Sequence, residues 1–111
     1  MITVLSYFPG QKVTIFLEVV DGYNRVNSIT TPKIDGILLP DFSAMVGYPK
    51  FMSQIDVGLY VFQFTLPTGA SSIGSYLVDA SYTYQDGYSN SQLYQVIVNA
   101  PYGNFGTVTV G

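Results

Sequence analysis

The sequence contains no histidine, no cysteine and no tryptophan, and two of these absences exclude whole classes of chemistry. Without cysteine there is no thiol nucleophile and no disulfide bond. Without histidine there is no Ser–His–Asp triad, and the usual zinc sites also need histidine or cysteine ligands. We therefore expect a protein without enzymatic activity, without a catalytic site and without a cofactor or metal.

Charged side chains are also scarce. Four basic and seven acidic residues make up 10% of the 111 residues, against about 25% in an average protein. So few basic side chains cannot supply the positive surface that binds nucleic acid, so no nucleic-acid partner is expected. A surface of low charge repels itself weakly and tends to associate. The ten tyrosines also suit a surface that contacts other proteins, and we expect neighbouring subunits of an assembly to cover much of it. The alternative is that tyrosine is frequent simply because it is a good strand residue.

Long apolar runs are missing too. The mean hydropathy is positive, at +0.30. However, no stretch approaches the ~18 apolar residues of a membrane-spanning helix, so no membrane partner is expected. The first residues, Met1 to Val4, carry neither the basic start nor the long apolar stretch of a secretion signal, so we expect no export by that route.

The residues that are present favour short strands and turns. Eleven glycines and six prolines are spread along the chain. Residues 12–20 alternate between apolar and other side chains, and Asp-Gly pairs at 21–22 and 86–87 are typical of hairpins. The predicted strands are 2–7, 12–20, 33–39, 51–55, 59–66, 76–84, 93–98 and 105–110. We predict one all-β domain over 1–111, an antiparallel immunoglobulin-like β-sandwich of about seven or eight strands.

The predicted core comes from the alternating faces of these strands. It consists of Val13, Ile15, Leu17, Val19, Tyr60, Phe62, Phe64, Tyr76, Val78 and Val96. Residues 101–111 form either one more strand of the same sheet or a C-terminal arm that adds to the edge of a neighbour.

Three segments carry a resemblance to known domains. Residues 7–15 (YFPGQKVTI) join an aromatic residue, Pro-Gly-Gln and an alternating strand, while residues 58–64 (GLYVFQF) and 74–78 (GSYLV) place tyrosine two positions after glycine. Over about residues 7–100 this order resembles immunoglobulin-like and macroglobulin-type β-sandwich domains. The resemblance implies glycines that permit tight turns into strands, and inward tyrosines whose hydroxyls bond to nearby backbone. Without the cysteine pair and tryptophan, an antibody-type domain is excluded.

Four of the aspartates stand in predicted turns, next to glycine, proline or phenylalanine or, for Asp56, two residues before glycine: Asp21, Asp41, Asp56 and Asp86. Because aspartate commonly accepts hydrogen bonds from the backbone of its own turn, we interpret them as turn residues and not as paired catalytic carboxylates. A calcium site would draw on Asp86, Ser89 and Asn90, or on Asp21 and Asn24. Neither loop has the alternating acidic spacing of a dedicated site.

The three lysines lie near strand ends, at positions 12, 33 and 50. A Ser–Lys dyad needs a buried lysine beside a serine. Lysine at a strand end more often keeps a sheet edge solvated. We therefore interpret Lys12, Lys33 and Lys50 as surface residues.

The candidate partner contacts are four aromatic side chains. Tyr23, Tyr88 and Tyr102 lie in predicted loops, and Phe105 begins the strand predicted over 105–110. Such rings fill a pocket of a partner protein or stack on a sugar. The alternative is that they fold back onto the end of the sandwich.

These features favour a structural role. A lone small sandwich with few charges and many Tyr, Thr and Gly resembles bacteriophage decoration, head-fibre, neck and tail proteins. The resemblance implies a non-enzymatic structural subunit located in the virion and assembled in the host cytoplasm. Its partners would be other virion proteins or copies of itself, and no small-molecule substrate is expected. The alternative is an adhesion or carbohydrate-binding immunoglobulin-like module.

Overall fold

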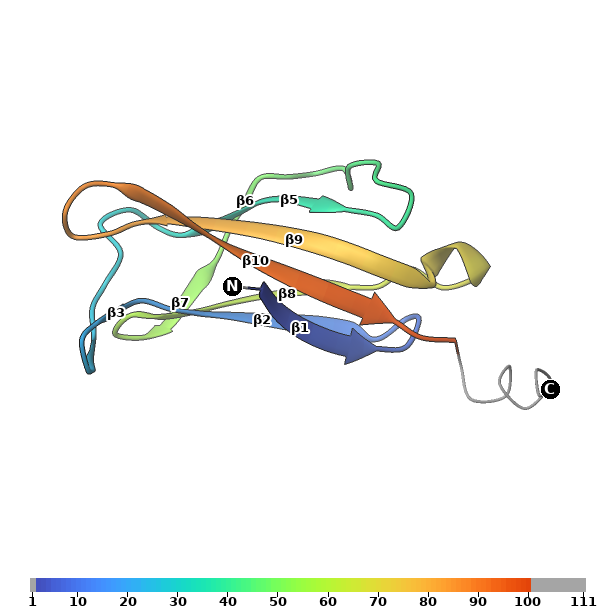
Figure 1. Ribbon diagram of the computed structural model, residues 1–111, viewed down its shortest axis with the longest axis horizontal. Coiled ribbons are helices and arrows are strands. Elements are labelled where there is room, and N and C mark those ends of the chain that lie inside the picture. The colour runs from blue at the N-terminus through green and yellow to red at the C-terminus, as the bar shows by residue number, and fades with distance from the viewer. Residues whose placement is uncertain (1, 101–111) are drawn as a thin grey trace.

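The computed structural model describes residues 2–100, which form ten strands and one short 3-10 turn (Figure 1). The elements are β1 (Ile2–Tyr7), β2 (Lys12–Glu18), β3 (Val20–Asp21), β4 (Asn24–Arg25), β5 (Lys33–Leu38), β6 (Lys50–Phe51), β7 (Ser53–Asp56), β8 (Leu59–Thr65), η1 (Ala70–Ser72), β9 (Gly74–Thr83) and β10 (Ser89–Val98). Seven of these strands have four or more residues, and three have only two. The chain is therefore all-β over the described residues, as the sequence predicts.

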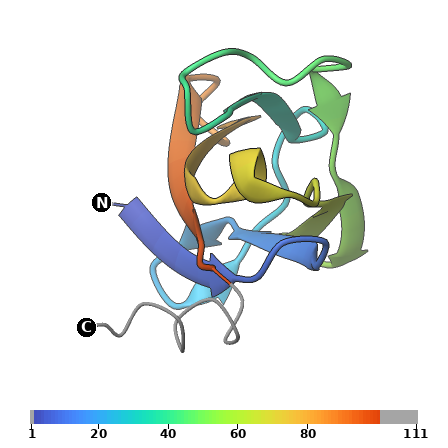
Figure 2. The same ribbon diagram turned by 90° about the vertical axis from the view of Figure 1, so that its right-hand side faces the viewer.

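The strands form two main layers. A five-stranded sheet has the order β1-β10-β9-β5-β6, and a three-stranded sheet has the order β2-β8-β7. The pairing is antiparallel except between β1 and β10, which are parallel. The view along the long axis shows the two sheets on either side of one interior (Figure 2). This arrangement is compatible with a β-sandwich.

The core lies between the layers. Nine of the ten predicted core residues are buried, because alternate side chains of each strand point toward the opposite sheet. The exception is Phe62, which is only partly buried. Its ring contacts the ring of Tyr48 edge to face, with 6.0 Å between the two ring centres. Tyr48 is also partly buried, so Phe62 packs at the margin of the core.

Several strand boundaries differ from the prediction. The strand predicted over 12–20 ends at Glu18, and the Asp21-Gly22 turn joins the two-residue strands β3 and β4 instead of two long ones. The segment predicted as one strand over 51–55 is divided between β6 and β7, which belong to different sheets. Between them the buried Met52 donates its N–H to the Pro32 carbonyl at 2.8 Å, where the chain crosses from one layer to the other.

Two further strands begin earlier than predicted. The strand predicted over 93–98 already begins at Ser89, and the one predicted over 76–84 spans Gly74–Thr83. Together they form a long antiparallel pair in the middle of the five-stranded sheet. The strand predicted over 105–110 and the arm predicted over 101–111 lie outside the described residues.

Gly58 shows why the first Gly-x-Tyr segment begins with glycine. Its φ is +65°, and a Cβ atom there would lie 2.7–2.8 Å from backbone atoms of Val19 and Val26. Two residues later, Tyr60 is buried and its hydroxyl accepts a hydrogen bond from the Ser28 N–H at 3.0 Å. The expected tight turn and tethered tyrosine are thus confirmed here.

The second Gly-x-Tyr segment behaves in the same way. Gly74 has a φ of +136°, and a Cβ atom there would lie 2.9 Å from the Pro40 side chain. Tyr76 is fully buried, and its hydroxyl donates a hydrogen bond to the Ser72 carbonyl at 2.9 Å. The hydroxyl therefore fixes the turn η1 to the start of β9.

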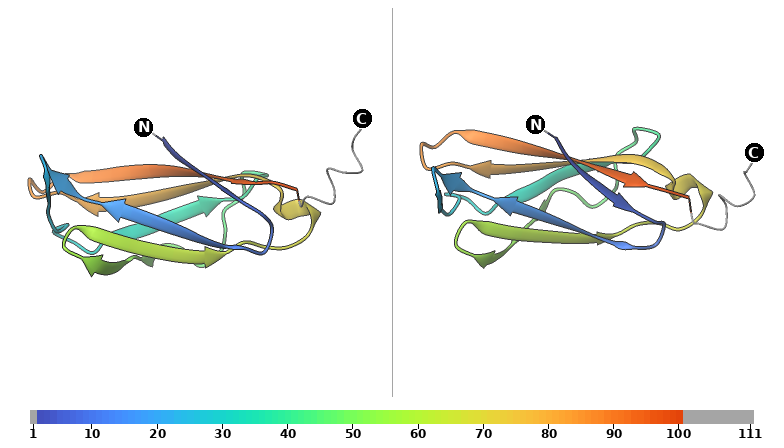
Figure 3. Two further views of the ribbon diagram at one scale, coloured as in Figure 1. Left: turned by 90° about the horizontal axis from the view of Figure 1, so that it is seen from below. Right: turned by 60° about the horizontal axis from the view of Figure 1, so that its bottom comes forward.

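Two other tyrosine hydroxyls bond to the backbone of β2. This strand is an edge of the three-stranded sheet. The strand before it in the chain, β1, belongs to the other sheet, where it runs beside β10 (Figure 3). The Thr14 N–H donates to the Tyr7 hydroxyl at 3.2 Å, and the Tyr94 hydroxyl donates to the Phe16 carbonyl at 2.6 Å. Side chains from the other sheet thus bond to backbone groups of an edge strand.

Candidate interaction surface

Two of the predicted contact residues lie at the same end of the molecule. Tyr23 follows Gly22 in the β3–β4 turn, and Tyr88 ends the β9–β10 turn. Both turns lie at the left-hand end in Figure 1. Tyr23 is fully exposed and Tyr88 is 74% exposed, so neither ring folds back onto the body. Tyr102 and Phe105, the other two candidates, lie outside the described residues.

Hydrogen bonds hold the backbone that carries Tyr88. The Tyr84 N–H donates to the Tyr88 carbonyl at 3.0 Å, and the Gly87 N–H donates to the Tyr84 carbonyl at 2.8 Å. The Asp86 carboxylate accepts a bond from the Tyr88 N–H at 3.0 Å. The exposed ring is therefore presented from a closed, positioned turn, which lowers the entropy that a partner must remove on binding.

The β3–β4 hairpin is fastened to the same end by charges. Arg25 pairs with Glu18 at 2.7 Å and with Asp56 at 3.5 Å. These groups are largely exposed, so each pair contributes only about 0–1 kcal/mol, but the guanidinium links the hairpin to β2 and to β7. Tyr84 lies near the second turn. Two causes raise the pKa of its hydroxyl: the larger is burial, and the next is the negative charge of the Asp21 carboxylate. The electrostatic effect of Asp21 on Tyr84 agrees with the two turns lying together.

The aspartates predicted as turn residues hold their own turns. Asp41 accepts from the Ser43 N–H at 3.0 Å, and Asp56 accepts from the Val57 N–H at 2.8 Å. Together with the bond at Asp86 described above, this confirms the turn interpretation for three of the four. Among residues 2–100, no three acidic side chains lie close enough together to hold a metal ion.

The lysines also lie where the sequence predicts. Lys12, Lys33 and Lys50 are the first residues of β2, β5 and β6, and all three are exposed. Lys33 lies 3.7 Å from Asp35, and the Lys50 ammonium lies 5.0 Å from the centre of the Tyr48 ring. No helix within residues 2–100 has the length and apolar character needed to cross a membrane.

Exposed apolar side chains are not confined to the tyrosine end. Phe16 points outward from β2, Val4 lies on β1 and Phe51 lies on β6. Phe42 and Val46 are exposed in the loop between β5 and β6. Apolar surface therefore occurs on both sheets and on a loop far from Tyr23 and Tyr88 in the fold.

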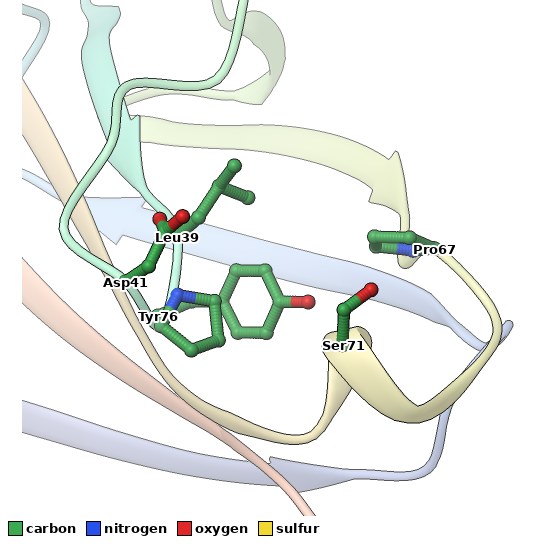
Figure 4. Close-up of a pocket in the computed structure, with 6 residues that line it drawn as sticks. Leu39, Asp41, Pro67, Ser71 and Tyr76 are labelled. Carbon is green, nitrogen blue, oxygen red and sulfur yellow. The ribbon is translucent and has the colours of Figure 1, made fainter.

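A hollow lies away from the predicted contact residues. It has a volume of about 480 Å³ and is formed by the β5–β6 loop, the β8–η1 connection and the start of β9 (Figure 4). Its lining is Leu39, Pro40, Asp41, Pro67, Ser71 and Tyr76. Sequence reasoning missed this hollow, because its walls come from segments that only the fold brings together.

Comparison with known proteins assigns no family. No family model matches the chain, and no curated protein matches it either. We therefore argue a function from the fold and the surface described above.

Proposed function

We propose that this protein is a non-enzymatic structural subunit of a large assembly, such as the decoration or the neck and tail accessories of a bacteriophage particle. It contacts its neighbours through the turn end that carries Tyr23 and Tyr88 and through further apolar side chains elsewhere. The observation that carries the proposal is that exposed apolar side chains occur on several sides of one small domain. A subunit with several neighbours needs such a distribution, whereas a single ligand site does not.

We further propose that the fold is immunoglobulin-like. The neighbours β10-β9-β5 correspond to strands G-F-C of that fold, and β2-β8-β7 correspond to B-E-D. Tyr76 supports this correspondence, since a tyrosine near the start of strand F commonly bonds to backbone a few residues upstream. The buried Val78 stands two residues later, where antibody domains have their second cysteine.

The correspondence gives the tyrosine end a meaning. Tyr23 lies between β2 and β5, which is the B–C connection, and Tyr88 lies between β9 and β10, which is the F–G connection. In variable domains these two connections lie at the same end and form part of the binding surface. The proposed contacts are therefore on a part of the fold that is well suited to recognition.

The low charge of the chain supports an assembly in a second way. Only 10% of its residues are charged, so adjacent copies or neighbours repel one another weakly. Individual contacts of exposed single rings are weak. On a lattice, many such contacts act together and give strong attachment by multivalency.

Sedimentation of native lysate tests the proposal. The chain is expected to travel with megadalton particles and to remain there in high salt, since its mass of 12.1 kDa cannot pellet alone. A double variant, Tyr23→Ala with Tyr88→Ala, is expected to stay at the top of the gradient, while the matched Phe–Phe variant keeps the rings and still sediments. The proposal is wrong if the unmodified chain stays at the top.

One observation favours a second candidate function, carbohydrate binding in adhesion. Tyr23 and Tyr88 present two exposed rings at one end, and such rings can stack on sugars. A glycan screen with the purified chain separates the two functions. Loss of glycan binding in the double alanine variant, with intact assembly, supports adhesion; loss of assembly alone supports the structural role.

A further inference from the structure

A polar groove lies between the segment that leads from β4 into β5 and the strands β7 and β8. It has a volume of about 340 Å³, and its lining comes from residues 27–31, from Gln54 on β7 and from Tyr60 on β8. Among the described residues, none that lines the groove is charged. The volume lies at the lower end of the range of roughly 300–1,000 Å³ that small-ligand sites span. The groove therefore has the size and the neutral character of a site for a small uncharged molecule.

Two amide side chains in the lining hold each other in a fixed orientation. The Asn27 Oδ1 accepts hydrogen bonds from the Gly58 N–H at 2.9 Å and from the Gln54 Nε2 at 2.7 Å. The Gln54 Nε2 also donates to the Asp56 carbonyl at 3.1 Å. Because a backbone N–H only donates and a carbonyl only accepts, neither amide can be turned around. The Asn27 Nδ2 and the Gln54 Oε1 have no partner within residues 2–100, so the pair offers one free donor and one free acceptor.

A buried tyrosine adds a third polar group. Tyr60 is 3% exposed, and its hydroxyl accepts the Ser28 N–H at 3.0 Å. The proton of this hydroxyl has no acceptor among the residues that the structure describes. Since Tyr60 also lines the groove, its hydroxyl is available to donate to a molecule bound there. A side chain that otherwise belongs to the core thus brings a positioned donor to the groove.

One wall of the groove is fastened to the end of β9. The Ser28 hydroxyl donates to the Thr83 carbonyl at 3.0 Å and accepts the Thr83 N–H at 3.1 Å. The Ile29 N–H donates to the same carbonyl at 2.9 Å, and the hydroxyl oxygens of Thr30 and Thr83 are hydrogen-bonded at 2.9 Å. A site whose walls are already held in place loses little entropy when it binds. The groove is therefore formed before a ligand arrives.

We infer that this groove binds a neutral saccharide. A sugar hydroxyl both donates and accepts hydrogen bonds, so neighbouring hydroxyls of one sugar match the free donor of Asn27 and the free acceptor of Gln54. The exposed Thr31 hydroxyl has no partner within residues 2–100 and offers a further hydrogen bond. Ile29, which is 58% exposed in the lining, presents an apolar surface to the C–H groups of a sugar ring. An apolar ligand would leave these polar groups unpaired, and a charged ligand would find no opposite charge in the lining.

The groove is separate from the two exposed rings of the turn end, because neither Tyr23 nor Tyr88 lines it. The inference therefore goes beyond the proposed structural role and does not rest on it. Since the ring of Tyr60 is buried, hydrogen bonds supply most of the affinity, and we expect a Kd on the order of 1 mM. Many copies on one assembly would strengthen such attachment by multivalency.

NMR titration of the purified full chain tests the inference. The probes are the methyl glycosides of glucose, galactose, mannose and N-acetylglucosamine, added up to about 10 mM, which is roughly ten times the expected Kd. At least one of them is expected to shift the amide signals of Ser28 and Gly58, whose N–H groups bond to the Tyr60 hydroxyl and the Asn27 Oδ1. The methyl glycoside of glucuronic acid carries a carboxylate and should shift these signals less than its neutral counterpart does.

Single substitutions separate the groove from the rest of the surface. Asn27→Asp keeps the oxygen that bonds to Gly58 and Gln54 but replaces the free donor with an acceptor, so the Kd is expected to rise about tenfold. Thr31→Val keeps the shape of the side chain and removes one hydroxyl, with an expected rise of about threefold. Asn24→Asp is the matched control, because it makes the same change on β4 outside the lining and should leave the Kd unchanged.

Circular dichroism shows whether each variant is folded, and Thr31→Val decides the question alone if Asn27→Asp does not fold. The inference is overturned if no neutral probe shifts these amides, or if the folded groove variants bind as tightly as the unmodified chain. It is also overturned if alanine at both Tyr23 and Tyr88 removes binding, because the sugar then sits on those rings.

The outcome is separable from the test of the proposed function. A chain that binds a sugar in the groove but never travels with particles supports the inference and removes the structural role. A chain that travels with particles and binds none of the probes removes the inference and leaves the structural role intact.

Discussion

Replacing Tyr76 with phenylalanine removes one buried oxygen atom and leaves the ring in place. The ring is fully buried, and its hydroxyl donates to the Ser72 carbonyl at 2.9 Å. Ser72 is also buried, so water does not readily replace the lost donor. A buried acceptor left without a partner costs about 1–3 kcal/mol. We expect the free energy of unfolding of Tyr76→Phe to fall by that amount.

Urea denaturation measures this loss directly. Unfolding can be followed by tyrosine fluorescence or circular dichroism, since the chain has no tryptophan. With a slope of about 1–2 kcal/mol per molar urea, the midpoint is expected to fall by roughly 1 M. Tyr88→Phe is the control, because that side chain is exposed and its loss of a hydroxyl should change stability by less than about 0.5 kcal/mol.

Amide exchange provides a second readout for the same variant. The Ser72 and Ile73 N–H groups close the turn η1 by bonding to the carbonyls of Gly69 and Ala70. Without the tyrosine hydroxyl, these two amides are expected to exchange faster than they do in the unmodified chain. A midpoint and an exchange pattern equal to those of the unmodified chain would refute the assigned role of the hydroxyl.

Three further measurements follow from the same structure. Gly58→Ala should lower the free energy of unfolding by more than about 3 kcal/mol, because the new Cβ meets backbone atoms. Gly22→Ala has the same φ of +65° but open space around it, so it should lower the free energy of unfolding by about 1 kcal/mol. Similar losses in the two variants would contradict the steric account. Burial raises the pKa of Tyr94 to about 12, against about 10 in the unfolded chain. The free energy of unfolding should therefore keep its full value below about pH 10 and fall by roughly 2 kcal/mol toward pH 12. Tyr94→Phe should show a shallower fall over the same range. Alanine at both Tyr23 and Tyr88 should leave the free energy of unfolding in urea unchanged within about 0.5 kcal/mol, and a larger loss would show that the rings support the fold.

Much of the fold is predictable because local patterns and tertiary packing agree. The alternation at Val13, Ile15 and Leu17 requires only that one face of a strand be buried, and the two layers bury it. The Gly-x-Tyr segments combine a turn that excludes side chains with a ring that needs a polar partner. The pattern of residues is local and can be recognised from the sequence, although the groups that contact Gly58 and Tyr60 come from distant segments.

The division of residues 50–56 between two sheets is not local. The dipeptide at 50–51 pairs with β5 and the segment 53–56 pairs with β8, and the crossing takes place at the buried Met52. An apolar residue inside a predicted strand does not reveal that the chain changes layers there. Only the positions of β5 and β8 decide it.

The candidate surface is predictable in part. Loop positions for Tyr23 and Tyr88 follow from the Asp-Gly pairs, but their placement at one end depends on the topology. Asp41 and Ser43 indicate a turn in the sequence, yet nothing in that pattern places Phe42 at positive φ. The hollow lined by Asp41 depends on the distant segment 67–76, which no local pattern reveals.

The tyrosine hydroxyls on β2 also bear on whether assembly can stop. An open edge strand can accept another strand, which exposes a further edge, and growth of that kind has no natural end, as in fibres. Here an incoming strand would first have to displace the hydroxyls of Tyr7 and Tyr94 from Thr14 and Phe16. The edge at β2 is therefore a less favourable place for a further strand than an edge whose backbone groups have no such partners.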